Sequence, residues 1–293
     1  MAFLKRSTCP ICKGKDFNKI FERSFEDKDT VQFIKTHFSK NFPMKILKDK
    51  KFIINECFTC TGLFQENILN KSFTNRLYEK YIIEKDSFIK KKIFTTRNFQ
   101  IYLNELKFIE KNLNKKPKDI KILEVGAGWG YWAFLAKSCN FEIQTVDISK
   151  TRVKYMKRNG LKAHNNLSQI SDTKFDIVYS DQTLEHVSSP NDLINFFSKL
   201  LNKNGCIILK VPTGLFTKRK LNKKYKFAQD ELIPLEHINI FNLKSFKFLA
   251  RKFSLKVIFP RPTSPLMTVG YFKELIINSM DYFLNKKIIL KKI

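Results

Sequence analysis

The sequence contains no long uninterrupted apolar run. A membrane-spanning helix needs roughly 20 consecutive apolar residues, and no stretch of this chain reaches that length. The first residues already include Lys5 and Arg6, which leaves no room for the apolar core of a secretory signal peptide. We therefore expect a cytoplasmic protein. Its 293 residues can bury a sizeable core, as one large domain or as one domain with a small module.

Acidic residues are scarce relative to basic ones. The chain has 27 Asp and Glu against 55 Lys and Arg, a net charge of +28. Such a charge is typical of proteins that bind nucleic acid. However, lysine greatly outnumbers arginine, which is better suited to forked contacts with phosphates and bases. We interpret the charge chiefly as the bias of an A/T-rich coding sequence. Phosphorylated sugars, lipid phosphates or RNA remain possible partners of a basic face.

Glycine is scarce too, yet three of the nine glycines fall in one short loop. Residues 122–131 have the pattern of a buried strand, a turn containing Gly126, Gly128 and Gly130, and the start of a helix. Side-chain-free backbone of this kind lets a nucleotide or nucleoside approach closely. Tyr131 stands where a dinucleotide fingerprint needs its third glycine, so the spacing argues against a dinucleotide.

A second strand supports a nucleoside site. Residues 142–147 are predicted to form it, and they end in Asp147. An acid at this place in a doubly wound sheet takes the ribose hydroxyls. The alternative is an ordinary strand, turn and helix that bind nothing.

Cysteine is limited to six residues, but four of them form two C-x-x-C pairs: Cys9, Cys12, Cys57 and Cys60. Two such pairs let four thiolates converge on one tetrahedral ion, and zinc is the expected occupant. The site would be structural, because four sulfurs leave no open position. Disulfides are disfavoured in a reducing cytoplasm, and two redox C-x-x-C motifs are not expected. Cys139 and Cys206 have the pattern of ordinary core thiols.

Strand and helix patterns alternate through most of the chain. Strands are predicted at 120–125, 142–147, 161–164, 175–180, 205–211, 254–259 and 266–272. Helices are predicted at 72–85, 98–113, 130–138, 149–159, 190–201 and 243–252. The alternation predicts an α/β protein with a doubly wound, mostly parallel seven-stranded sheet and a small N-terminal zinc-ribbon-like module.

Several motifs occur together in the order of a known family. They are Ile122–Gly130, Val146–Ile148, Phe175–Val178, Leu184–Val187 and Gly205–Leu209. In this order they resemble class I S-adenosylmethionine-dependent methyltransferases over about 120–260. The front module resembles the zinc-binding region attached to many bacterial members, some of which methylate sugars or sugar nucleotides. The core also resembles the quinone-pathway O-methyltransferases.

The resemblance implies a division of the chain. We expect a zinc-binding module at 1–70, a helical linker or lid at 71–117 and a methyltransferase domain at 118–272. An insert at 213–240 is expected to cover the substrate. The basic, amphipathic end at 273–293 is expected to be a helix, either packed on the core or resting on an anionic membrane, where a lipid-linked acceptor would be accessible.

The resemblance also implies the cofactor contacts. The expected residues are Glu124, Gly126, Gly128, Gly130, Asp147, Ile148, Asn166 and Asp181. Glu124 and the glycines match the loop that holds the methionine part of S-adenosylmethionine. Asp147 matches the acid that binds both ribose hydroxyls, and Ile148 the residue beside the adenine. Asn166 aligns with a position that is often Asp and touches the adenine amine, a bond that an amide oxygen can also accept.

Histidine is limited to four residues. Its pKa near neutrality suits the removal of a proton from a hydroxyl or an acidic carbon. We interpret His37 as a surface residue and His164 as structural. His186 and His237 are the expected catalytic residues, with Glu236 orienting its neighbour or a substrate hydroxyl.

We expect methyl transfer to a small acceptor, namely a sugar, sugar nucleotide or glycan precursor, on oxygen or carbon. Pro234 stands where deoxysugar C-methyltransferases typically have a tyrosine. Gln182 stands where quinone-pathway enzymes can have a carboxylate, so the sequence supports no second metal site. One alternative is an RNA methyltransferase that uses the basic surface and the zinc module. Another is a non-catalytic scaffold that binds the cofactor.

Overall fold

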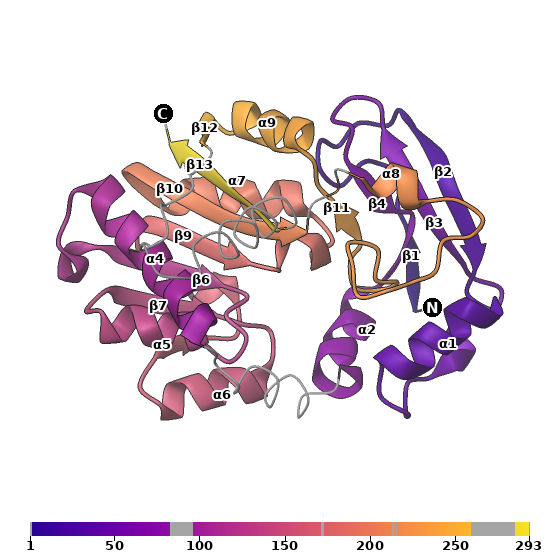
Figure 1. Ribbon diagram of the computed structural model, residues 1–293, viewed down its shortest axis with the longest axis horizontal. Coiled ribbons are helices and arrows are strands. Elements are labelled where there is room, and N and C mark those ends of the chain that lie inside the picture. The colour runs from indigo at the N-terminus through magenta and orange to yellow at the C-terminus, as the bar shows by residue number, and fades with distance from the viewer. Residues whose placement is uncertain are drawn as a thin grey trace, which may run out of the picture. The chain divides into compact units, whose positions relative to one another are not determined.

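The computed structural model describes residues 2–82, 96–170, 173–212, 214, 216–258 and 285–292. The chain divides into two compact units (Figure 1). The first comprises Met1–Glu84, Leu184–Asn195 and Val211–Phe253. The second comprises Lys85–Thr183, Phe196–Lys210 and Ser254–Ile293. No helix in the described ranges is both long and apolar enough to cross a membrane.

The second unit is built on a seven-stranded sheet. Its strands are β6 (Lys121–Val125), β7 (Glu142–Val146), β8 (Lys162–His164), β9 (Phe175–Asp181), β10 (Leu201–Pro212), β12 (Leu255–Ile258) and β13 (Asn285–Lys292). Their order across the sheet is β12-β13-β10-β9-β6-β7-β8. The pairs from β10 to β8 are parallel, whereas β12 and β13 are antiparallel. The predicted Rossmann-like, mostly parallel sheet is confirmed.

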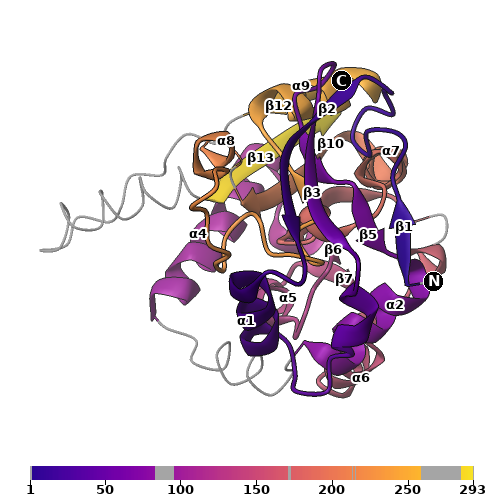
Figure 2. The ribbon, with the colours of Figure 1, turned by 90° about the vertical axis from the view of Figure 1, so that its right-hand side faces the viewer.

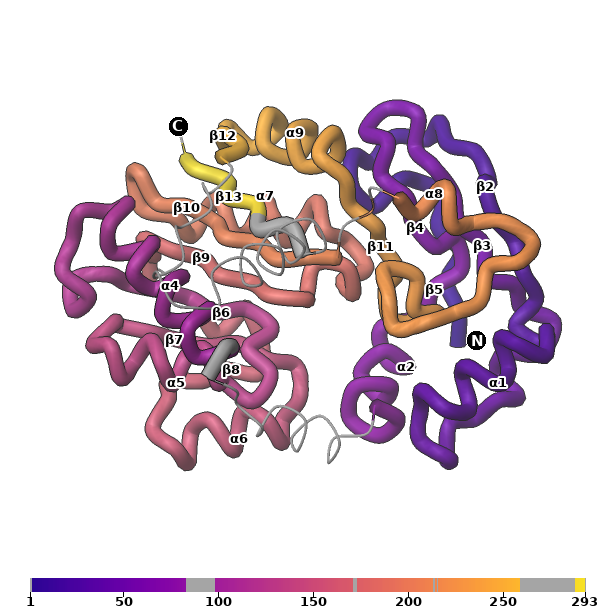
Figure 3. Tube along the Cα trace, in the orientation of Figure 1, coloured from indigo at the N-terminus to yellow at the C-terminus, as the bar shows by residue number. Residues whose placement is uncertain are grey.

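Helices α4 (Thr96–Leu113), α5 (Tyr131–Ser138) and α6 (Lys150–Arg158) belong to the same unit. Figure 3 traces them beside the labelled strands. Leu106 of α4, Trp132 of α5 and Met156 of α6 share one buried cluster with Ile122 and Ile177, which are register partners on β6 and β9. The three helices therefore bury their apolar sides against one face of the sheet.

The strand order reverses between β6 and β9. From β6 the chain runs outward to β7 and β8, and it then returns to the other side of β6 through β9 and β10. In open α/β sheets the ligand pocket lies beyond the carboxyl ends of the strands at such a reversal. The glycine loop follows β6, Asp147 follows β7 and Asp181 ends β9, so the expected cofactor residues share this edge.

The first unit has two small sheets. Strands β2 (Phe17–Ser24), β3 (Lys51–Cys57), β4 (Leu63–Gln65) and β11 (Asn239–Ile240) form a four-stranded antiparallel sheet. The two long strands β2 and β3 run side by side in Figure 2. Strands β1 (Phe3–Lys5) and β5 (Asn67–Leu69) form a separate antiparallel pair.

Short helices complete the first unit. They are α1 (Lys28–His37), η1 (Met44–Leu47), α2 (Lys71–Arg76), the π-helical turn η2 (Leu77–Tyr81), η5 (Leu184–His186), α8 (Thr217–Lys220) and α9 (Leu243–Lys252). Helix α7 (Pro190–Leu200) contains the boundary between the units at Asn195. Asp27 caps α1 by accepting hydrogen bonds from the backbone amides of Asp29 and Thr30.

Polar side chains join the three stretches of the first unit. The Asn239 side-chain amide donates to the carbonyl oxygens of Leu184 and Val187 at 3.2 and 2.7 Å. Asn191 donates to the carbonyl of Ile11 at 2.7 Å, beside the first cysteine pair. Residues 213–240, expected as an insert over the substrate, thus contribute to the same unit as the front module.

The end of the chain differs from the prediction. The helix expected over 273–293 is wrong for Asn285–Lys292, which form β13. Ile288, Ile289 and Leu290 are all buried, and successive side chains of a strand point to opposite faces of its sheet, so both faces are covered at this strand. The remaining residues of that predicted helix, and the strand predicted at 266–272, lie outside the described residues.

Removal of apolar volume from β13 should destabilise the second unit. Ile289 is 3% exposed and belongs to the cluster under α4, α5 and α6. We expect Ile289→Ala to lower the free energy of unfolding by about 2–4 kcal/mol. Urea denaturation followed by tryptophan fluorescence measures this, because both tryptophans lie in this unit.

Lys291→Ala is the matched control, because Lys291 is an exposed residue of the same strand. If both variants unfold at the same urea concentration, β13 does not belong to the core.

Candidate functional site

All three glycines of the loop after β6 have positive φ, and two of them also lie close to other side chains. Gly126 and Gly130 each have φ +76°, in the left-handed region that disfavours other residues. A Cβ on Gly126 would collide with the side chain of Thr183, and one on Gly130 would lie 2.9 Å from Cγ of Met156. Backbone packing is therefore as tight here as the sequence predicts, and α5 begins directly after Gly130.

Asp147 faces this loop. Its Oδ2 accepts a hydrogen bond from the backbone amide of Gly128 at 2.7 Å, and its Oδ1 accepts one from Ser149 at 2.9 Å. The residue is 5% exposed, and Nη1 of Arg152 lies 3.9 Å from Oδ2.

The two residues expected near an adenine lie at the surface of the second unit. The side chain of Ile148, directly after Asp147, is 50% exposed, which is unusual for a large apolar residue at the end of a buried strand. Asn166 is exposed, and its Oδ1 accepts a hydrogen bond from the backbone amide of Ser168 at 3.0 Å at the start of a short 3₁₀ turn (Leu167–Gln169). Ile148 is therefore available to contact a flat apolar ring.

Buried charges surround the ends of β9 and β10. Asp181 accepts a hydrogen bond from Nζ of Lys210 at 2.8 Å, and Glu105 of α4 lies 3.4 Å from the same nitrogen. Glu105 also accepts hydrogen bonds from Trp132 and Tyr179 at 3.1 and 3.0 Å. Burial opposes the charge of Lys210, but the two carboxylates outweigh it and raise its pKa.

Sequence reasoning missed Glu105 and Lys210. Glu105 lies on α4 and Lys210 on β10. The one signal in the sequence that could have indicated them is a charged residue on the apolar side of a predicted helix or strand. Glu124, which was predicted, is 4% exposed on β6 and pairs in register with Thr145 and Tyr179. Three acidic residues thus lie on the strands and helix that lead to the glycine loop.

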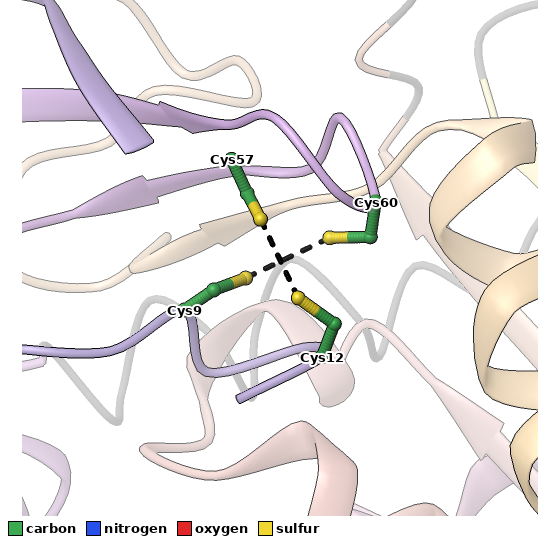
Figure 4. A group of neighbouring side chains, drawn as sticks. All are labelled: Cys9, Cys12, Cys57 and Cys60. Atoms are coloured by element: carbon green, nitrogen blue, oxygen red, sulfur yellow. Dashed lines mark hydrogen bonds between the residues drawn. The ribbon is translucent and has the colours of Figure 1, made fainter. Parts of the chain in front are cut away.

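The four cysteines of the two pairs converge in the first unit (Figure 4). Sγ of Cys9 lies 3.6 Å from that of Cys60, and Sγ of Cys12 lies 3.4 Å from that of Cys57. All four are buried. The hydrogen bond between Cys9 and Cys60 lowers the pKa of Cys9 and raises that of Cys60. None of the six cysteines forms a disulfide bond.

The two cysteine turns have the same backbone geometry. The amide of Lys13 donates to Cys9 O, and that of Thr61 donates to Cys57 O, each at 2.9 Å. Lys13 and Thr61 have φ of 69° and 56°. Two matching turns aim two pairs of sulfurs at one centre, which suits a tetrahedral four-sulfur site for zinc.

Three of the four histidines gather around Glu236 in the first unit. Nε2 of His37 lies 2.6 Å from Oε1 of Glu236, and Nδ1 of His186 lies 3.0 Å from the backbone oxygen of Glu236. The rings of His186 and His237 have centroids 4.8 Å apart, and the ring of Tyr78 stands edge-on to His186 at 5.9 Å. The structure thus brings together the three residues predicted to be catalytic.

Burial sets the charge state of this cluster. It lowers the pKa of His237 to about 3, with a further contribution from His186, and it also lowers the pKa of His186. Both rings are therefore neutral near pH 7, and each neutral ring has one nitrogen that donates and one that accepts.

His37 was interpreted as a surface residue, and this is wrong. Its side chain is only 15% exposed, and its ring stacks on Phe33 with centroids 5.1 Å apart. Its partner Glu236 lies far along the sequence, so no local pattern could have indicated the contact. His164 ends β8, and burial together with Lys162 lowers its pKa.

Residues 97–258 match the family model described as a methyltransferase domain, and the chain belongs to this family. With the Rossmann-like sheet and the glycine loop, this match defines an S-adenosylmethionine-dependent methyltransferase domain.

Individual relatives support this class. The ubiquinone biosynthesis O-methyltransferase of Pelagibacter ubique (strain HTCC1062) is 29% identical over 140 residues, which are 42% of this chain and 56% of that protein. The chain thus spans a little over half the length of this relative. The plantazolicin methyltransferase BpumL in complex with SAH has a TM-score of 0.52 and 12% identity, over 75% of this chain and 94% of its own.

A second plantazolicin methyltransferase, BamL, solved with a triazolic desmethylPZN analog and SAH, has a TM-score of 0.50 and 18% identity. The match covers 71% of this chain and 90% of BamL. At these identities the two solved structures show the fold alone.

Replacement of Asp147 should weaken cofactor binding. We expect Asp147→Ala to reduce the affinity for S-adenosylmethionine by about 2 kcal/mol, roughly 30-fold, because charged hydrogen bonds to the ribose and to the Gly128 amide are lost. Titration calorimetry measures this change.

Asp119→Ala is the control, because Asp119 is an exposed acid in the same unit. Equal affinities of the Asp147 variant and the wild type would refute the ribose assignment.

Proposed function

We propose that the enzyme transfers the methyl group of S-adenosylmethionine to a small acceptor, namely a sugar, a sugar nucleotide or a glycan precursor, by O- or C-methylation. The observation that carries the proposal is the buried cluster of His37, His186, His237 and Glu236. Such acceptors present hydroxyls or acidic carbons, which must lose a proton when the methyl group is transferred. Imidazole rings beside a carboxylate are suited to accept that proton, and this applies to His37 and His186 rather than to His237, whose pKa burial lowers to about 3.

In this proposal the cofactor is held by the edge of the sheet in the second unit. Glu124 and the glycine loop hold the methionine part, Asp147 the ribose hydroxyls, and Ile148 and Asn166 the adenine. Asp181 and its partner Lys210 border the same edge. The cofactor supplies an activated methyl group on a sulfonium, so the protein has to orient the acceptor and remove its proton.

Hydrogen bonds indicate which nitrogen can accept a proton. A backbone carbonyl only accepts, so Nδ1 of His186 carries hydrogen toward Glu236 O and leaves the lone pair on Nε2. A carboxylate likewise only accepts when ionised, so Nε2 of His37 carries hydrogen toward Glu236 Oε1. The Glu236 carboxylate stabilises positive charge that forms on these rings, as an acid beside a catalytic histidine does.

We further propose that Cys9, Cys12, Cys57 and Cys60 bind a structural zinc ion. Their chemistry fits, because four buried sulfurs on two matching turns provide a complete tetrahedral shell. Cys57 ends β3, so the ion would fix the end of the four-stranded sheet to the N-terminal turn.

RNA is a second candidate acceptor, favoured by one basic hollow. It has a volume of about 330 Å³ on α6, and its lining includes Lys150, Lys154, Lys157 and Arg158. RNA binding that weakens steeply with salt would support this alternative. Methylation of sugar nucleotides without RNA binding would oppose it.

Loss of one zinc ligand should release the ion and unfold its surroundings. We expect Cys57→Ser to lose the zinc bound by thiolates and to expose the first unit to proteolysis, because structural zinc supplies folding free energy. Thiol titration together with metal analysis measures the thiolate-bound zinc. Cys139→Ser is the control, since Cys139 lies in the other unit. Full retention of thiolate-bound zinc in Cys57→Ser would contradict the ligand set.

His237 should affect turnover and not cofactor binding. We expect His237→Ala to lower turnover by roughly 10²- to 10⁴-fold, because it removes the ring that packs against His186 in this cluster, with little change in affinity for S-adenosylmethionine. The assay follows S-adenosylhomocysteine release with a panel of dTDP- and UDP-linked sugars. His164→Ala serves as the control, and undiminished turnover of His237→Ala would remove His237 from the mechanism.

A further inference from the structure

Three side chains beside Glu236 form a second group of possible metal ligands in the described part of the chain. Glu185, His186 and His237 each offer one ligand atom, and the three atoms lie within 4.8 Å of one another. All three belong to the first unit. Glu185 is 2% exposed, His237 is 8% exposed, and the side chain of His186 is 17% exposed.

The hydrogen bonds of His186 leave a lone pair toward Glu185. Its Nδ1 donates to the backbone oxygen of Glu236 at 3.0 Å, so the neutral ring has its lone pair on Nε2. That nitrogen lies 3.9 Å from Oε1 of Glu185, which is too long for a hydrogen bond. Two ligands bound to one ion at about 2.1 Å lie about 3–3.4 Å apart. Side-chain movements of less than about 1 Å would therefore let both atoms bind the same ion.

His237 supplies an independent observation. Its Nδ1 is buried and has no hydrogen-bond partner among the described residues. The backbone of Asp230 interacts favourably with a proton on this ring, and since Nδ1 has no partner, we assign that proton to Nε2. Nδ1 is then an acceptor without a donor, in an interior where polar atoms nearly always have partners. A cation can bind the lone pair of His237 Nδ1 and the carboxylate of Glu185 at the same time.

We propose that Glu185, His186 and His237 bind a divalent transition-metal ion, at a site distinct from the four cysteines. Metal-bound histidines typically donate their second nitrogen to a carbonyl or carboxylate, which fixes the tautomer and aims the other nitrogen at the metal. His186 has this arrangement, with the backbone oxygen of Glu236 as its partner. Two imidazoles and one carboxylate suit Zn²⁺, Fe²⁺, Mn²⁺, Co²⁺ or Ni²⁺ and leave coordination positions open.

The sequence did not indicate this site, because the third ligand comes from a separate stretch of the chain. Gln182 supplies no carboxylate near Glu185, and His237 takes the third position only after folding. The hydrogen bond of His37 to Glu236 holds the residue whose carbonyl orients His186.

The role of the ion, unlike its binding, rests on the proposed function. The ion would draw an acceptor oxygen into an open position and favour loss of its proton. His186 and His237 would then be ligands without a free lone pair, and proton acceptance would pass to the pair of His37 and Glu236.

The experiment uses the full chain with zinc already bound by the four cysteines. Co²⁺ is added, the excess is removed, and zinc and cobalt per chain are measured with the visible spectrum. We expect one cobalt per chain with the zinc retained. The spectrum should be weak, as for nitrogen and oxygen ligands, without the intense charge-transfer bands of cobalt thiolates. No retained cobalt, or cobalt that appears only with thiolate bands as zinc leaves, would overturn the proposal.

Variants locate the ion. His237→Gln and Glu185→Gln should each weaken Co²⁺ binding by at least about 100-fold, the upper end of what changes around a metal's ligands cost. His164→Gln should bind Co²⁺ as the wild type does, because His164 lies in the second unit. Unchanged Co²⁺ affinity in His237→Gln would exclude this ligand set.

The wild-type measurement needs no variant to fold, and S-adenosylmethionine binding is measured on the same samples. A protein that binds the cofactor and methylates sugar nucleotides but takes up no second ion would refute the metal site and leave the proposed function standing. Uptake of the ion without any sugar methylation would support the metal site and refute the proposed function.

Discussion

The hydrogen bond from the amide of Gly128 to the carboxylate of Asp147, 2.7 Å long, joins the ends of β6 and β7. The edge of the second unit at which we propose cofactor binding depends on this bond. The loop can approach Asp147 because Gly126, Gly128 and Gly130 all take left-handed backbone angles, and because Gly126 has no Cβ that would collide with Thr183. The same carboxylate accepts a bond from Ser149, whose side chain caps α6. The Asp147 carboxylate therefore connects the glycine loop, the end of β7 and the start of α6 by hydrogen bonds.

In the first unit, Glu236 likewise connects separate stretches of chain by hydrogen bonds. Its carboxylate contacts His37 from α1, and its backbone oxygen orients His186 from η5. Three stretches of chain therefore contribute to one buried cluster, and a change at any of them alters the surroundings of the others. The four cysteines add a second convergence, where Cys57 at the end of β3 meets the turn from Cys9 to Cys12.

Sequence patterns predicted what depends on neighbours along the chain. The strands around the glycine loop and helices such as α5 and α9 were predicted within a few residues, because apolar spacing and glycine act locally. The convergence of the two C-x-x-C pairs could also be predicted from their spacing. The role of Asn285–Lys292 was not, because a short run of Lys and Ile suits a helix or a strand, and its neighbours β10 and β12 decide. The contact of His37 with Glu236 was missed for the same reason.

The first unit is assembled from stretches that end only at Phe253. Phe52 and Leu63 share their apolar cluster with Leu232 and Leu235, so this core cannot close on the ribosome until most of the chain has been made. The four thiols are all available once Cys60 has left the ribosome. A metal ion bound at that stage would hold strands β2 and β3 in place until the rest of the first unit has been synthesised. A polypeptide cut after Glu84 would leave both halves with uncovered apolar surface. The first unit is therefore complete only after strands β6 to β10 of the second unit have been synthesised.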